Sequence, residues 1–226
     1  MNDLLNSTID NKNIGLLKNL WELRQALDVY ELISANAKGI NERGIGRNFF
    51  GFLRASCLHL ITLYICKVFE AEEKPDKQGK VKHELSSIDG VLKSSATANL
   101  NVLDPKEING FVRQYSHGQC GDGTLSAISL TVRDFKARYK KELKRFQEAR
   151  DKWGAHSEFG FSPEDLPSYD IMERLFDFGH DFYRLVYHAF ITCVVPCDLN
   201  ADRKVKASLK KVFEELGIKE IRTEMK

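Results

Sequence analysis

Apolar residues recur at intervals of three and four positions along most of this 226-residue chain, the spacing that places them on one face of an α-helix. The clearest segment runs from about residue 14 to residue 37, with Gly39 expected to stop the helix. Its stripe consists of Leu16, Leu20, Leu23, Leu27 and Tyr30. Only 5 prolines occur, where average usage of about 5% would give about 11. This pattern favours long helices over a turn-rich β architecture.

The other periodic segments predict an all-α fold, a helical bundle of four to five main helices with short accessory helices. The segment from about 48 to 73 is apolar around most of its circumference, as expected of a central bundle helix. Shorter helices are predicted at 86–98 and 105–114. Long helices are predicted at 125–153 and from 168 to about 196.

A last amphipathic helix is predicted at 202–216, with four apolar residues on one face: Val205, Leu209, Val212 and Leu216. We expect a bundle domain over residues 1–197 and a C-terminal helical tail over 198–226. The glycine-rich stretch 116–123 lacks the Lys-Ser/Thr ending of a phosphate-binding P-loop, so it is interpreted as a connection between helices.

Composition narrows the class of protein. Lys and Arg number 34 against 32 Asp and Glu, a net charge of +2, which excludes a histone-like polycation and an acidic disordered chain. The 5 cysteines form no CxxC pair and no Cys/His array, so we expect no metal site and no cofactor. Charged or polar residues interrupt the apolar stretch 49–69, and the first residues do not resemble a secretory signal. A cytoplasmic protein without a membrane span is expected.

Arg150 is the residue that most needs an explanation. It continues the row of Phe135, Tyr139, Phe146 and Trp153, on the face of the long helix that should be buried. A guanidinium buried without a partner is costly. Either an acid on a neighbouring helix pairs with it, or it binds a ligand.

His156 lies six residues beyond Arg150. On a straight helix the two would be about 120° apart around the axis and about 9 Å apart along it, so they would not share a face. A helix end or kink at Gly154 would bring them together. Alternatively, two subunits would pack their long helices so that arginines and histidines from both converge.

Arg150-Asp151, followed by four residues and His156, resembles the signature of the HEPN superfamily. The local amino-acid sequence is similar to the AbiU-like abortive-infection branch of that superfamily. The end of the second helix at Phe69-Glu70 and the start of another near residues 86–88 support the likeness. The resemblance implies a helical bundle, usually dimeric, that acts as a metal-independent endoribonuclease in phage defence or as a toxin. It also implies an antitoxin or a nucleotidyltransferase-type protein as a partner.

The resemblance further implies a role for each residue of the motif. His156 would remove the proton from a ribose 2′-hydroxyl, because histidine exchanges protons near neutral pH. Arg150 would hold the scissile phosphate. Asp151 would orient the histidine or the arginine. The products would be a 2′,3′-cyclic phosphate and a 5′-hydroxyl, and DNA would not be cut.

Local charge is compatible with an RNA partner. Residues 133–152 contain nine basic and four acidic side chains, a local charge of +5. Lys144, Arg145 and Lys152 are the predicted RNA-binding residues. The competing interpretation is a solvated helix face with Lys/Glu pairs.

Two further hypotheses stay open beside the ribonuclease. One is a catalytically silent HEPN-type module that binds RNA, a nucleotide or a protein. The other is a helical interaction protein in which Arg150 and His156 make structural contacts only. His59 and His188 lie in apolar segments and are expected in the core or at an interface. The position of Arg150 on an apolar row predicts that a homodimer forms through the long motif helix.

Overall fold

The computed structural model describes residues 15–71, 86–96, 105–116, 125–155, 163–190, 198–201 and 203–218. Within these residues the regular structure is entirely helical, so the predicted all-α bundle is confirmed. In chain order the elements are α2 (Leu16–Ala35), α3 (Ala37–Arg43), α4 (Arg47–Phe69), α5 (Ile88–Ala96), α6 (Pro105–Tyr115), α7 (Leu125–Arg138), α8 (Lys140–Ala155), the 3-10 helix η1 (Pro163–Asp165), α9 (Tyr169–Phe190) and α10 (Lys204–Glu215).

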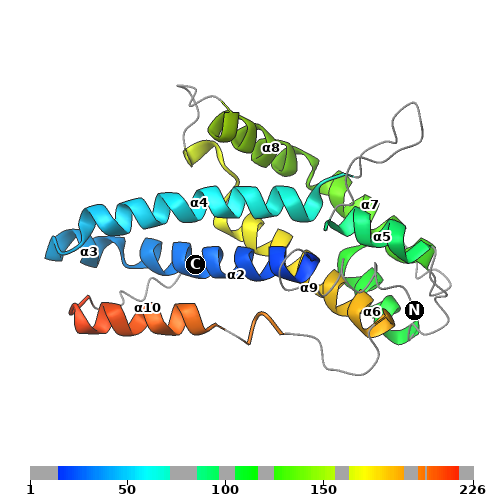
Figure 1. Cartoon of the computed structure of the whole chain (residues 1–226). Helices are drawn as coiled ribbons and strands as arrows, with labels where there is room; N and C mark the ends of the chain where they lie inside the picture. Colours follow the sequence, from blue (N-terminus) through cyan, green and yellow to red (C-terminus); the bar gives the residue numbers. More distant parts are fainter. Residues whose placement is uncertain are drawn as a thin grey trace.

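Helices α2 and α4 lie side by side at the centre of the fold (Figure 1). Helix α8 packs on α4 on the side away from α2, and α10 packs on α2 on the side away from α4. Helix α9 contacts both α2 and α4, while α6 packs against α7 and α9. The central pair therefore carries the motif helix on one side and the C-terminal helix on the other.

The main core is rich in aromatic side chains. The rings of Phe135 on α7 and Phe178 on α9 stack with centroids 3.7 Å apart and planes 7° apart. Beside them, Gly179 lets α9 approach its neighbours closely. A Cβ at that position would lie 2.9 Å from Leu20 Cδ2 on α2 and 3.3 Å from Val68 Cγ1 on α4. The absence of a side chain at residue 179 thus fixes the spacing of the three central helices.

A buried polar network joins α2, α9 and α10. Arg24 on α2 donates to both carboxylate oxygens of Glu173 on α9, at 2.8 and 2.7 Å, and its Nε donates to Asp28 Oδ1 at 2.9 Å. Arg203, which precedes α10, pairs with the same Asp28. Lys206 Nζ on α10 donates to Glu31 Oε2 at 2.5 Å. These ion pairs hold the C-terminal helix against α2.

The prediction of which face of α10 is buried is partly wrong. Val205 and Val212 are exposed, and the anchor is Phe213, which is 3% exposed and packs its ring edge-on against Phe50 of α4. Leu209 and Leu216, also on the predicted face, are half-buried against a second, smaller core, which consists of Leu32, Ile33, Ile40, Phe50, Phe213 and Ile218. Phe213 is buried in preference to the valines because burying its larger apolar area stabilises the fold more than burying that of valine. The expected boundary between a bundle domain (1–197) and a C-terminal tail (198–226) stays a prediction.

Two helix boundaries also differ from expectation. Gly39 does not stop a helix: α2 ends at Ala35, and Gly39 lies inside α3, which ends before Gly44 at φ +66°. The buried Asn36 donates from its side chain to Leu32 O at 2.8 Å and marks the break. Hydrogen bonding to its own helix in this way competes with continuation of the helix.

The long motif helix is divided at Tyr139 into α7 and α8. Backbone hydrogen bonds still run through the junction, from Tyr139 N to Phe135 O at 3.1 Å and from Leu143 N to Tyr139 O at 2.9 Å. Helix α7 packs on α6 whereas α8 packs on α4. The bend therefore serves two different neighbours, and no proline or glycine marks it in the sequence.

Candidate functional site at the junction of α4 and α8

Helix α8 places the motif against α4. Phe146 and Ala149 are completely buried in the core, so the apolar row of this helix faces α4 of the same chain. Farther along, Trp153 stacks on His59 of α4, with ring centroids 4.2 Å apart and planes 4° apart. Arg150 lies near the C-terminal end of α4 and Trp153 near its middle, so the two helices run antiparallel.

Arg150 is at the edge of this packing surface, with 37% of its side chain exposed. Its Nε donates to Asp151 Oδ1 at 3.0 Å, and its Nη2 lies 3.0 Å from the same oxygen. Its Nη1 lies 3.7 Å from Glu70 Oε1 at the end of α4. The acid on a neighbouring helix that was one of the two expected explanations is thus present. The guanidinium nevertheless retains contact with solvent.

Electrostatics keep Arg150 charged. Partial burial alone would lower the pKa of Arg150, but the hydrogen bond with Asp151 and the nearby acidic groups, including Glu70, outweigh it and raise the pKa. Cys66, one turn before Glu70 on α4, is 4% exposed, and burial raises the pKa of its thiol to about 11. Arg150 can therefore act as a fixed cation, and Cys66 is a protonated thiol rather than a nucleophile.

Of the other two residues of the predicted motif, the structure describes Asp151 but not His156. Asp151 is 66% exposed, and its carboxylate accepts from Arg150. His156 lies outside the described residues. Helix α8 is described through Gly154 as far as Ala155, and the expected meeting of His156 with Arg150 stays a prediction.

The predicted RNA-binding residues lie on or beside the outer surface of α8. Lys144 is 72% exposed and its Nζ lies 3.4 Å from Glu148 Oε1, one turn away. Arg145 is exposed and Lys152 is half-buried. The Lys/Glu pair expected of a solvated helix face is present at Lys144, and basic groups suited to phosphate remain at the surface.

Sequence reasoning missed the pairing of His59 with Trp153. His59 was expected in the core or at an interface, but it is exposed and stacked on the indole. No local pattern could have revealed this contact, because it depends on the antiparallel packing of two helices distant in sequence. The His188 side chain lies outside the described residues.

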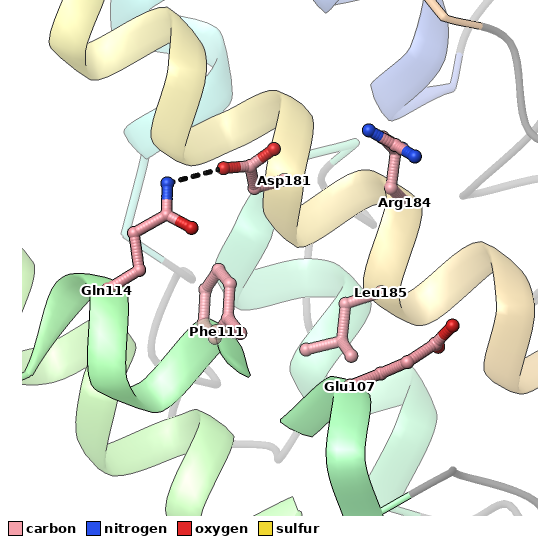
Figure 2. A pocket seen from close by; sticks show the side chains of 6 residues that line it. All are labelled: Glu107, Phe111, Gln114, Asp181, Arg184 and Leu185. Carbon is pink, nitrogen blue, oxygen red and sulfur yellow. Dashed lines mark hydrogen bonds between the residues drawn. The ribbon is translucent and has the colours of Figure 1, made fainter. Parts of the chain in front are cut away.

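A separate pocket of about 220 Å³ lies between α6 and α9 (Figure 2). Asp181 at its wall accepts from Gln114 Nε2 at 3.0 Å and from the Tyr115 hydroxyl at 2.6 Å. Burial and the hydrogen bond to Asp181 raise the pKa of Tyr115. In the part of the chain that the structure describes, no group of three metal-binding side chains occurs. The pocket is lined by residues of α6 and α9, outside the α4–α8 junction.

Comparison with known proteins identifies no relative: no family model, no curated protein and no solved structure matches this chain.

Proposed function

We propose that this protein is a HEPN-type, metal-independent endoribonuclease acting in phage defence or as the toxin of a toxin–antitoxin pair. The observation that carries the proposal is the state of Arg150: charged, held by Asp151, and still 37% exposed on the surface beside a basic helix. A cation held in this way and still open to solvent can bind an RNA phosphate. The spacing from Arg150 to His156, which resembles the HEPN signature, supplies the second element of the proposal.

In the proposed mechanism, Arg150 binds the scissile phosphate and stabilises charge developing on its oxygens. His156 accepts the proton of the attacking 2′-hydroxyl. As the 2′-oxygen bonds to phosphorus the P–O5′ bond breaks, and the leaving 5′-oxygen takes a proton from solvent. Asp151 acts on the arginine, since its carboxylate already fixes Nε and Nη2. The contact with Glu70 is long, at 3.7 Å, so a phosphate would compete with that carboxylate for Nη1. Lys144, Arg145 and Lys152 would bind flanking phosphates.

RNA is the proposed substrate, and the chemistry requires no cofactor. We propose a cytoplasmic protein that forms a homodimer and is restrained by an antitoxin or a nucleotidyltransferase-type partner.

Cleavage of end-labelled RNA in EDTA tests this function. Arg150→Ala and His156→Ala are each expected to lower the rate at least about 100-fold, the usual scale for losing an electrostatic or acid–base group. Arg150→Lys should retain part of the activity, because it keeps the charge but loses the planar fork. Circular dichroism should show an unchanged fold, since an exposed ion pair contributes only about 0–1 kcal/mol.

Arg133→Ala is the matched control. Arg133 on α7 is also followed by an aspartate, with Nε 3.8 Å from Asp134 Oδ1, and is 77% exposed. Its removal should leave the rate unchanged. Cleavage that survives both Arg150→Ala and His156→Ala contradicts the assignment. Loss of cleavage in His59→Ala, with His156→Ala still active, would move the base to the histidine on α4.

The silent HEPN-type module is the second candidate, and one observation favours it: two carboxylates, from Asp151 and Glu70, already accompany Arg150. Under this alternative the wild-type protein binds the labelled RNA but leaves it intact.

A further inference from the structure

We infer that the outward face of α4 is the interface of a two-fold homodimer. It locates an interface for the homodimer proposed above, and it rests on the exposure and spacing of residues on α4 rather than on the ribonuclease activity. The face consists of a stripe on α4 that turns away from α2 and runs beside α8: Phe49, Phe52, Ser56, Leu60 and Leu63, of which Ser56 and Leu63 are half-buried. Phe49 is 61% exposed, Phe52 is 72% exposed and Leu60 is 40% exposed. None of the five residues carries a charge.

Such a face is unusual for a helix that contacts only its own chain. A surface helix normally presents charged and polar residues to solvent, whereas a helix that is apolar all round is buried. Helix α4 is apolar enough to satisfy the length and composition expected of a membrane span, which by itself is weak evidence for one. Only 39% of its most apolar 18-residue window is buried inside the fold. The packing of the monomer therefore leaves this helix incompletely covered.

The spacing of the stripe points to a second copy of the same chain. The intervals between its five residues are three, four, four and three, which read the same in both directions. If two copies of α4 pack antiparallel about an axis at Ser56, Phe52 lies beside Leu60 of the second copy. Phe49 then lies beside Leu63 of the second copy. Each pair then occurs twice, once on either side of the axis, as a two-fold interface requires, and in each pair an aromatic ring meets a smaller aliphatic side chain.

Ser56 suits the position on the axis. Its side chain is small enough to let two helices approach within the usual 8–10 Å. Its hydroxyl already donates to Phe52 O at 3.0 Å within the helix. Covering it with a second copy therefore leaves no unpaired donor, which would otherwise oppose association.

The size of the face also fits. A phenylalanine presents about 200 Å², so Phe49 and Phe52 at their observed exposures present about 270 Å² together. Leu60 and the neighbouring Ile45, which is 48% exposed, bring the patch to roughly 400 Å² per protomer. A standard interface buries about 800 Å² per partner, of which about 60% is apolar. The patch thus approaches the apolar area that such a dimer needs.

This geometry differs from a dimer built on the motif helix. The apolar row of α8 is occupied by α4 of the same chain, so it is not available to a partner. Because Arg150 lies beside Cys66 and Glu70, ten or more residues from the axis, the two copies of Arg150 are about 30 Å apart or farther.

Two charge substitutions and their mixture test the interface. The wild-type protein is expected to sediment at twice the chain mass of 25.8 kDa, and Phe52→Lys and Leu60→Glu should each raise the dimer dissociation constant about 100-fold or more. Mixed together, the two variants should form a heterodimer, because the new lysine faces the new glutamate on one side of the axis while the native pair remains on the other.

Leu130→Glu is the matched control, since Leu130 on α7 is 45% exposed, close to the exposure of Leu60. It should remain dimeric, and circular dichroism should show that every variant is folded. A monomeric wild type, dimers that survive both stripe substitutions, or a mixture that stays monomeric would each overturn the inference. A monomeric wild type that binds vesicles of phosphatidylserine and phosphatidylcholine would instead assign the face to a membrane surface.

Discussion

Replacing Arg24 with methionine removes the centre of the polar network that joins α2 to α9. The guanidinium is 3% exposed, makes a paired contact with Glu173 and donates to Asp28. It also lies over the ring of Phe176, 4.8 Å from its centroid. Methionine keeps much of the stem volume but leaves the carboxylate of Glu173 without its main partner.

Removing one member of a buried ion pair typically costs about 3–5 kcal/mol. The lower end applies here for two reasons: the Glu173 side chain is 25% exposed, and Asp28 keeps Arg203 as a partner. We therefore expect the free energy of unfolding to fall by about 3 kcal/mol at pH 7. Lys18→Met provides the control, since the Lys18–Glu22 pair on the same helix is about one-third exposed and should contribute less than about 1 kcal/mol.

The pH dependence follows from Glu173. Burial alone would raise the pKa of Glu173, but the hydrogen bonds and charge of Arg24 outweigh it and lower the pKa from its ordinary value of 4.5. A lowered folded-state pKa means that the pair's contribution is present above about pH 4.5 and is lost as pH falls through the folded-state value. The difference between wild type and Arg24→Met should therefore shrink in acid.

Urea unfolding followed by far-UV circular dichroism measures these differences. Arg24→Met combined with Glu173→Leu should recover a large part of the loss, because no buried charge is left unpaired. A cost below about 1 kcal/mol for Arg24→Met, or a difference that grows in acid, would refute the reasoning.

Three further predictions concern α9 and the thiol beside the site. Burial and the neighbouring Glu173 and Asp181 raise the pKa of Asp177, so its ionised form destabilises the fold once the pH exceeds that pKa. Asp177→Asn removes two like-charge pairs and should add about 0.4–1 kcal/mol to the unfolding free energy at pH 7. A gain that persists in acid, where Asp177 is protonated, would contradict this explanation. Gly179→Ala places a methyl group 2.9 Å from a side chain of α2. It should lower the free energy of unfolding by about 1–2 kcal/mol and lower the thermal midpoint. An unchanged midpoint would show that the helices can move apart without loss of stability. Burial raises the pKa of the Cys66 thiol from 9.0 to about 11. At pH 8 it should therefore react with iodoacetamide at least about 100-fold more slowly in the native protein than in urea, as measured by mass spectrometry. Equal rates would mean that α8 separates readily from α4.

Helix positions could be predicted from the sequence because burial on one face imposes a spacing that is visible locally. The stripe Leu16, Leu20, Leu23, Leu27 is an example, and all four residues are completely buried. The break at Tyr139 could not be predicted. It arises because α7 and α8 pack on different helices, and no residue at the junction disfavours a continuous helix. The burial of Phe213 rather than the valines on α10 likewise depends on the apolar side chains that α2, α3 and α4 present to it.

The candidate site was predictable in part. The requirement that Arg150 have a partner followed from its position on an apolar row, but the identity of that partner as Glu70 depended on how α4 and α8 cross. The Arg24–Glu173 pair spans 149 positions, and no local pattern reports such a distance. His156 lies outside the described residues, so its meeting with Arg150 stays a prediction.

The chemistry of the cleaved RNA end tests the proposed function most directly. Mass spectrometry of the fragments formed by the full-length protein in EDTA reads this end without assuming a target sequence. Attack by the neighbouring 2′-hydroxyl predicts a 2′,3′-cyclic phosphate on one fragment, a 5′-hydroxyl on the other, and no cleavage when the ribose at the cut carries no 2′-hydroxyl. Fragments that end in a 3′-hydroxyl and a 5′-phosphate, or RNA that stays intact, would contradict the account.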